Sequence, residues 1–346
     1  MKIRLKPIAD QVIVITGASS GIGLATARMA ADTGAKVVVA ARSEPELKQL
    51  VREIELNGGE AAYIVADVGQ EDDVIAIAEA AEQEFGRIDT WVNNAGVSIY
   101  GRVLEVPINE QRQLFETNFW GLVYGCRVAA QCLRRRGGAI INVGSTVSDR
   151  AIPLQGTYSA SKHAVKGFTD ALRMELEEEG APISVSLIKP GAIDTPYTRH
   201  ARNYLGSEPK NPPPLYAPEV VAEAILHCAE HPERDVFVGA GGKAISALGT
   251  YAPRLMDKIM EFAFFKQQVS GERPARGTHR SLFEPSHDLH TRSGYKGHVA
   301  ESSAYTKASL HPMITSAVAV GTGLALAAIW KSQSGGDGVQ QTNEYW

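Results

Sequence analysis

A buried strand that runs into a glycine-rich turn and then a helix is the feature that most limits how this chain can fold. Residues 11–16 contain four consecutive β-branched residues, which is typical of a strand buried on both faces. An Ala-rich helix to about residue 33 follows the turn Gly17-Ala18-Ser19-Ser20-Gly21-Ile22-Gly23. A helix that begins in this way presents free N–H groups and its positive dipole end to a phosphate. The arrangement predicts a dinucleotide-binding α/β domain with a doubly wound, Rossmann-like parallel sheet.

Composition is that of an ordinary globular protein. The chain has 346 residues, of which 44% are hydrophobic and 21% charged, and a formal net charge of −4. This balance gives no sign of a nucleic-acid partner, and one α/β domain of roughly 250 residues fits within the length. Three cysteines without a CxxC pair predict neither a disulfide framework nor a metal site, and we expect no signal peptide at the start.

A tyrosine and a lysine four residues apart predict acid–base chemistry. Tyr158 and Lys162 would stand one turn apart on the same face of a helix. An ammonium that close favours the phenolate, so we expect Lys162 to lower the pKa of Tyr158 from its usual value of about 10. Such a phenol exchanges a proton with a carbonyl or alcohol oxygen near neutral pH. Taken alone, the pair would more often be a surface tyrosine beside a solvated lysine.

The chain resembles the classical short-chain dehydrogenases/reductases over about residues 8–242. The glycine turn is spaced GxxxGxG, an Asn-Asn-Ala-Gly stretch at residues 93–96 follows a predicted strand, and Ser145 lies thirteen residues before Tyr158. The resemblance implies an NAD(P)-dependent oxidoreductase whose catalytic residues are Asn118, Ser145, Tyr158 and Lys162. In the family an asparagine at the place of Asn118 holds a water that connects the lysine to solvent. The alternative is a buried asparagine whose amide is satisfied by backbone.

The resemblance also implies where the cofactor binds. The implied residues are Gly17, Ser19, Ser20, Gly21, Ile22, Gly23, Arg42, Asp67, Val68, Asn94, Ala95, Gly96, Tyr158, Lys162, Pro190, Gly191, Ile193 and Thr195. The second predicted strand ends at Ala41 without the carboxylate that would hold a ribose 2′-hydroxyl, and Arg42 follows. An arginine suits a 2′-phosphate, so we expect NADP(H) to be preferred and NAD(H) to be possible, unless Arg42 is a solvated surface residue. Asn93 is as easily structural as directed toward the cofactor.

Residues 196–217 take the place of the family's substrate loop and carry tyrosines and leucines that could form an apolar cover. We therefore expect a hydrophobic ketone, aldehyde or secondary alcohol as the substrate. The opposing interpretation is a non-catalytic, membrane-associated NADP(H)-binding sensor or scaffold protein. The family further implies a homodimer or a homotetramer.

Beyond residue 242 the chain leaves the family's pattern. Residues 243–268 are rich in apolar side chains and predict a helical hairpin over the substrate mouth, rather than an amphipathic segment on a bilayer. Residues 269–312 are polar and predict a linker. His287 and His290 have a spacing that could suit a metal, but a lone pair of this kind is rarely a ligand pair.

Residues 313–331 predict a single membrane-spanning helix, followed by a short polar tail at residues 332–346. The first eighteen of these residues carry no charge. A helix of eighteen residues is barely long enough to cross the hydrocarbon core of a bilayer. The alternative is a hydrophobic helix that is buried or covers a partner subunit. Basic residues before the segment predict a membrane-associated protein with its catalytic domain in the cytoplasm, or a soluble cytoplasmic one if the segment does not insert.

Overall fold

The computed structural model of the protein describes residues 3–274, 280–311 and 315. Its main sheet has seven strands in the order β11-β7-β6-β4-β1-β2-β3, and every neighbouring pair is parallel. The strands are β1 (Val12–Thr16), β2 (Lys36–Ala41), β3 (Glu60–Val65), β4 (Thr90–Asn93), β6 (Gly138–Val143), β7 (Ile183–Pro190) and β11 (Asp235–Val238). Strand order reverses between β1 and β4, and an open α/β sheet binds its ligand at such a switch point.

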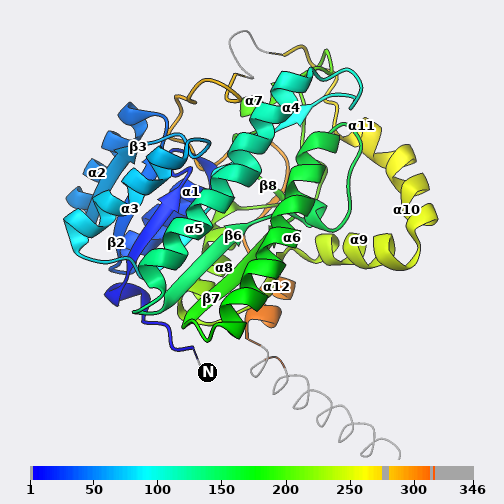
Figure 1. The fold of residues 1–346 in the computed structure, drawn as a ribbon. Helices are drawn as coiled ribbons and strands as arrows, with labels where there is room; N and C mark the ends of the chain where they lie inside the picture. The colour runs from blue at the N-terminus through cyan, green and yellow to red at the C-terminus, as the bar shows by residue number, and fades with distance from the viewer. Residues whose placement is uncertain (1–2, 275–279, 312–314, 316–346) are drawn as a thin grey trace, which may run out of the picture. The chain divides into compact units, whose positions relative to one another are not determined.

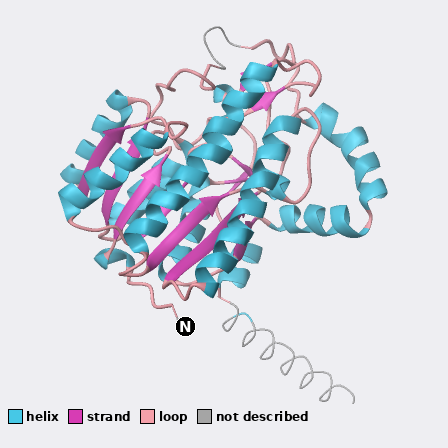
Figure 2. Cartoon of the chain, in the orientation of Figure 1, coloured by secondary structure: helices cyan, strands magenta, loops and turns pink. Residues whose placement is uncertain are grey.

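Helices cover both faces of this sheet (Figure 1, Figure 2). One face carries α1, α2 and α8, and the other carries α3, α5 and α6. The bounds are α1 (Gly21–Asp32), α2 (Glu44–Leu56), α3 (Glu71–Phe85), α5 (Gly121–Leu133), α6 (Gly156–Glu178) and α8 (Pro218–Glu230). The predicted Rossmann-like parallel sheet flanked by helices is confirmed.

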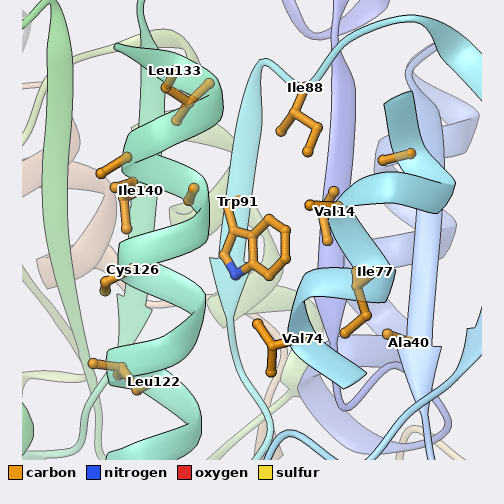
Figure 3. Close-up of a cluster of buried hydrophobic side chains, with 14 of the residues drawn as sticks. Val14, Ala40, Val74, Ile77, Ile88, Trp91, Leu122, Cys126, Leu133 and Ile140 are labelled. Atoms are coloured by element: carbon orange, nitrogen blue, oxygen red, sulfur yellow. The ribbon is translucent and has the colours of Figure 1, made fainter. Parts of the chain in front are cut away.

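Apolar side chains from the sheet and its helices form the core. All residues of β1 and β6 are buried, as expected of strands that are covered on both faces. Figure 3 shows Trp91 of β4 between the residues of α5 and those of α3. This packing holds the strand ends, and with them the loops above, in fixed positions.

The long helix expected within residues 107–136 is interrupted. The structure has α4 (Ile108–Phe115), a π-helical segment at Glu116–Trp120, and then α5. The extra residue of a π turn rotates the side chains that follow it, and such turns often occur at functional sites. Asn118 lies in the middle of this segment.

The shorter elements border the carboxyl ends of the main strands. They are Ile8–Asp10 and Thr146–Ser148 (both 3₁₀), β5 (Ile99–Tyr100), β8 (Ala192–Ile193), α7 (Tyr197–His200), β9 (Arg202–Asn203) and β10 (Leu215–Tyr216). The region beyond residue 239 contains α9 (Ala240–Tyr251), α10 (Pro253–Ile259), a π segment (Met260–Phe264), α11 (Phe265–Gln267), β12 (Val299–Ala300) and α12 (Ala304–Leu310).

The polar stretch predicted as a linker makes specific contacts with the catalytic domain. β12 pairs with β10, which in turn pairs with β8, so that these three short strands form a second sheet. A compact unit that includes this sheet ends at Thr306.

Within the described residues, no helix has both the length and the apolar character needed to cross a membrane. The predicted membrane helix at residues 313–331 and the tail at 332–346 lie outside the described residues, apart from Thr315.

Candidate active site

The carboxyl ends of four adjacent strands deliver the predicted site residues to one pocket. β1 leads into Gly17, β4 into Asn94, β6 into Ser145, and β7 ends at Pro190. Because parallel strands end at the same edge of the sheet, these loops meet although they are far apart in the sequence.

Nearly all of the residues implied for the cofactor and for catalysis line this pocket. The lining includes Gly17, Ser19, Ser20, Gly21, Ile22, Arg42, Asp67, Val68, Asn94, Ala95, Gly96, Ser145, Tyr158, Lys162, Pro190, Gly191, Ile193 and Thr195. Gly23 and Asn118 do not line it: Gly23 lies beneath the glycine turn, and the side chain of Asn118 faces the backbone of Val97.

The glycine turn requires its glycines for two different reasons. Gly17 and Gly21 have φ angles of +66° and +55°, which residues with a Cβ rarely adopt. A Cβ on Gly23 would lie 2.3 Å from the carbonyl oxygen of Gly17, so the helix can approach the strand only without a side chain there. The Asn94 amide holds the turn from the other side by donating to the carbonyl oxygens of Thr16 (2.9 Å) and Gly17 (3.2 Å). The turn therefore has the backbone conformation that accepts a pyrophosphate at the start of α1, although the N–H of Gly21 itself donates to the carbonyl oxygen of His290.

Asn93 has a structural role. Its Oδ1 accepts from the indole N–H of Trp91 at 2.8 Å, and its Nδ2 donates to Asn142 at 2.9 Å. The side chain is buried and lies outside the pocket lining. Of the two interpretations of Asn93, the structure favours the structural one.

Tyr158, Lys162 and Ser145 face the pocket together. Tyr158 and Lys162 occupy the first two turns of α6, and Ser145 follows β6. Lys162 is 5% exposed, its Nζ donates to the carbonyl oxygen of Val143 at 2.8 Å, and it lies 5.8 Å from the centre of the Tyr158 ring. Burial lowers the pKa of Lys162 to about 8.

The expectation that the pKa of Tyr158 lies below its usual value is wrong for this structure. Burial raises the pKa of the Tyr158 phenol, and hydrogen bonding with Tyr197 and Ser145 offsets part of that rise. The physical reason is that the pocket removes water from the phenol while the ammonium is directed at the Val143 carbonyl. The Tyr158 phenol is therefore protonated at neutral pH.

A glutamine beside Tyr158 was not predicted as a site residue, and Tyr197 was expected only as part of the apolar cover at residues 196–217. The ring of Tyr197 packs edge-on against that of Tyr158 with centroids 5.6 Å apart, and its hydroxyl donates to Gln155 Oε1 at 2.9 Å. Gln155 in turn donates to Gln268 Oε1 at 2.7 Å. Tyr197 and Gln155 line the pocket. No motif marks them, since their role depends on contacts between segments far apart in sequence.

Asn118 is buried and bonded to backbone. Its Oδ1 accepts from the N–H of Val97 at 2.8 Å, and its Nδ2 donates to the Val97 carbonyl at 2.9 Å. Asn118 and Lys162 both lie beside Gly96. A Cβ added to Gly96 would be 3.5 Å from Asn118 Oδ1 and 3.9 Å from Lys162 Nζ. Asn118 thus positions the loop that borders Lys162.

Arg42 lies at the other end of the pocket, against the C-terminal region. Its Nη2 donates to the carbonyl oxygens of Ser281 (2.6 Å) and Glu284 (3.0 Å). Burial lowers the pKa of Arg42, and the nearby Asp67 carboxylate acts in the opposite direction. Arg42 is not simply a solvated surface residue.

The two histidines with metal-like spacing make separate contacts. His287 Nδ1 lies 3.2 Å from Ser43 Oγ, whereas the carbonyl oxygen of His290 accepts from the N–H of Gly21. Among the described residues, no group of His, Cys, Asp or Glu side chains is placed to hold a metal ion.

Comparison with known proteins identifies the family. A family model of the short chain dehydrogenases matches residues 11–205. An uncharacterized oxidoreductase, YxnA of Bacillus subtilis, is 50% identical over 324 residues, which cover 92% of this chain and 91% of that protein. 11-beta-hydroxysteroid dehydrogenase A of Sesamum indicum is 31% identical over 281 residues, which cover 78% and 80% of the two chains.

Two solved structures share the fold. A short-chain dehydrogenase/reductase of Burkholderia phymatum in complex with NAD has a TM-score of 0.65 and 26% identity, and the match covers 74% of this chain and 96% of the other. An alcohol dehydrogenase of Thermococcus sibiricus complexed with 5-hydroxy-NADP has a TM-score of 0.59 and 27% identity, with 66% and 95% covered. The fold and pocket define a nucleotide-binding α/β enzyme. The chain belongs to the short-chain dehydrogenase/reductase family of oxidoreductases.

Proposed function

We propose that the protein transfers a hydride between NADP(H) and a hydrophobic ketone, aldehyde or secondary alcohol, with Tyr158 as the general acid or base. The observation that carries this proposal is the convergence of Tyr158, Ser145 and Lys162 on the pocket that also contains the glycine turn. A nucleotide-binding sensor would need the turn but not these three side chains. When bound, the nicotinamide supplies or accepts the hydride.

The chain's own residues handle the proton. The Tyr158 hydroxyl, protonated at neutral pH because burial raises its pKa, donates to the carbonyl oxygen of the substrate. The Ser145 hydroxyl donates to the same oxygen and positions it. The Lys162 ammonium stabilises the phenolate left behind. Asn118 fixes the loop at Gly96 and Val97 beside Lys162, and the proton returns to Tyr158 by way of Lys162.

Apolar and aromatic side chains favour a hydrophobic substrate. The pocket lining includes Ile152, Tyr197, Tyr216, Ile245 and Phe264. The similarity to a plant hydroxysteroid dehydrogenase supports a substrate of this general kind. We propose a lipid-like or steroid-like alcohol or ketone.

Tyr158→Phe tests the chemistry. It removes the proton donor but keeps the ring, so we expect turnover to fall at least about 1,000-fold while NADPH affinity changes less than twofold. The matched control is Tyr124→Phe, because Tyr124 of α5 does not line the pocket and its ring stacks on that of Trp120. Full activity in Tyr158→Phe would refute the role assigned to Tyr158. No change in nicotinamide absorbance with any carbonyl or alcohol for the wild type would favour the sensor.

Cofactor preference is tested separately. We expect the wild type to bind NADPH more tightly than NADH. Arg42→Ala should remove most of this difference in affinity by weakening the binding of NADPH alone. Isothermal titration of both nucleotides measures this. A wild type that prefers NADH would contradict the assignment of Arg42.

Membrane attachment through residues 313–331 and assembly as a homodimer or homotetramer are also part of this proposal. Fractionation of the full chain and of a chain that ends at His311 tests the first, and the mass in solution tests the second. A full-length protein found entirely in the soluble fraction would exclude the membrane helix.

A further inference from the structure

A polar segment near the C-terminus borders the cofactor end of the pocket. We define residues 281–293 as the C-terminal strap. Ser281, Pro285 and Ser286 of the strap line the pocket together with the glycine turn, and the N–H of Gly21 donates to the carbonyl oxygen of His290 at 2.9 Å. The strap lies outside residues 11–205, the part of the chain that the family model matches.

The strap holds Arg42 in a defined orientation. Arg42 Nη2 donates to the carbonyl oxygens of Ser281 and Glu284, which are 239 and 242 residues further along the chain. Arg42 Nη1 is buried and has no partner among the described residues, while Arg42 lines the pocket. A buried N–H without a partner is unfavourable, and a phosphate oxygen is the acceptor that a guanidinium binds best.

Two anchors hold the strap itself. Leu282 is 1% exposed and packs with Ile99, Val106 and Leu114. Asp288 accepts from His200 Nε2 at 2.8 Å and from Arg199 Nη2 at 3.1 Å. The Asp288 anchor therefore joins the strap to the end of α7, in the region predicted as the substrate loop.

We propose that the C-terminal strap is part of the cofactor site, where it fixes Arg42 as the receptor for the 2′-phosphate of NADP(H). Selectivity for NADP(H) over NAD(H) then depends on strap residues that do not touch the nucleotide. The strap also contacts the start of α2, because His287 Nδ1 lies 3.7 Å from the Glu46 carboxylate and 3.2 Å from Ser43 Oγ. This inference rests on the proposed NADP(H) preference.

The test compares two fragments of the cofactor, 2′,5′-ADP and 5′-ADP, by isothermal titration of the full-length protein. Asp288→Asn removes a charge from the strap's anchor, and Asp288 is not among the pocket-lining residues. We expect Asp288→Asn to lower the affinity for 2′,5′-ADP about fivefold and the affinity for 5′-ADP less than twofold. Leu282→Ala should lower the affinity for 2′,5′-ADP about tenfold and the affinity for 5′-ADP about twofold. The matched control Glu261→Gln changes an exposed carboxylate that pairs with Lys258 on the helical region away from the strap, and it should alter neither affinity.

A double-mutant cycle separates positioning from general damage. In an Arg42→Ala background, Asp288→Asn should no longer change the ratio of the two affinities, because the group it positions is absent. An undiminished effect in that background would overturn the inference. So would tighter binding of both nucleotides in the strap variants, which would mean that the strap competes with the nucleotide.

The failures of the two proposals are distinguishable. A wild type that binds 2′,5′-ADP no better than 5′-ADP would overturn the NADP(H) preference, and the strap's assigned role with it. A wild type with a clear preference that both strap variants retain would overturn the role of the strap alone. Thermal unfolding of each variant shows whether it is folded at the temperature of titration.

Discussion

Two segments that follow the last strand of the main sheet, residues 240–267 and residues 281–293, contact the pocket in contrasting ways. The C-terminal strap is held at the cofactor end by hydrogen bonds and ion pairs to Arg42, Gly21, Arg199 and His200. The helical arm, residues 240–267, borders the substrate end through Ile245 and Phe264 and extends away from α6 (Figure 1).

The arm is held by fewer polar contacts and exposes more apolar surface. Ser246 donates to Asp149 at 2.9 Å and Arg150 pairs with Asp257, whereas Tyr251 and Phe262 are 88% and 82% exposed. Directional hydrogen bonds define one geometry, which suits a constant ligand such as a nucleotide. Apolar contacts are less directional, which suits an end of the pocket that receives variable substrates.

The largest expected effect comes from a methyl group at the cofactor end. In Gly23→Ala, the Cβ would lie 2.3 Å from Gly17 O and 2.5 Å from Asn94 Nδ2, and neither can move without disturbing the turn. We expect a loss of about 3 kcal/mol in the free energy of unfolding and at least about 100-fold in NADPH affinity, measured by urea unfolding and titration.

Gly241→Ala, in the first turn of the arm, is the counterpart. No atom lies within 4 Å of its added Cβ. It should leave NADPH affinity unchanged and stabilise α9 by up to about 1 kcal/mol. Equal damage from both substitutions would contradict the distinction between the two ends.

The next effect is expected at Lys162, where the two ends meet. Burial lowers its pKa to about 8, below the usual value of about 10.4, so between these values the unfolded chain binds more protons than the folded one. Stability that depends on Lys162 therefore rises with pH through this window. At pH 7 we expect Lys162→Met to be more stable than wild type by about 2 kcal/mol, and the difference to shrink toward pH 10. Urea unfolding at several pH values measures it, and a constant difference would refute the assigned burial.

A smaller effect is expected where the arm joins the site. Gln268 is fully buried, accepts from Gln155 at 2.7 Å, and donates to the carbonyl oxygens of Pro153 and Phe264. Gln268→Ala leaves these groups without partners, so we expect a loss of about 2 kcal/mol in stability.

In the same variant the KM for the carbonyl substrate should rise while NADPH affinity is unchanged. The neighbouring exposed Gln267→Ala is the control and should change neither quantity. A fall in NADPH affinity for Gln268→Ala would show that the arm also serves the cofactor end.

The smallest effect is expected on the outer face of the arm. Phe262→Ser replaces an exposed side chain, so the free energy of unfolding should change by less than about 0.5 kcal/mol. Chemical unfolding and the mass in solution are the measurements. A large loss of stability or a change in mass would mean that another surface covers this face.

Local patterns in the chain were enough to predict the sheet, the glycine turn and the shared helix face of Tyr158 and Lys162, whereas the place of Ser145 beside them was implied by the family resemblance. A run of β-branched residues marks a buried strand, and a four-residue spacing on a helix places two side chains on one face whatever the surroundings. The same reasoning was wrong about the pKa of Tyr158, because desolvation depends on every segment that excludes water from the phenol.

Tertiary structure alone decided which distant groups pair. The amide of Asn118 hydrogen-bonds to the backbone of Val97. The guanidinium of Arg42 donates to two backbone carbonyl groups from a stretch whose polar composition predicted a linker. Every residue has a backbone carbonyl, so composition cannot predict which carbonyl group an arginine will bind. Only the folded path of the chain brings the two together.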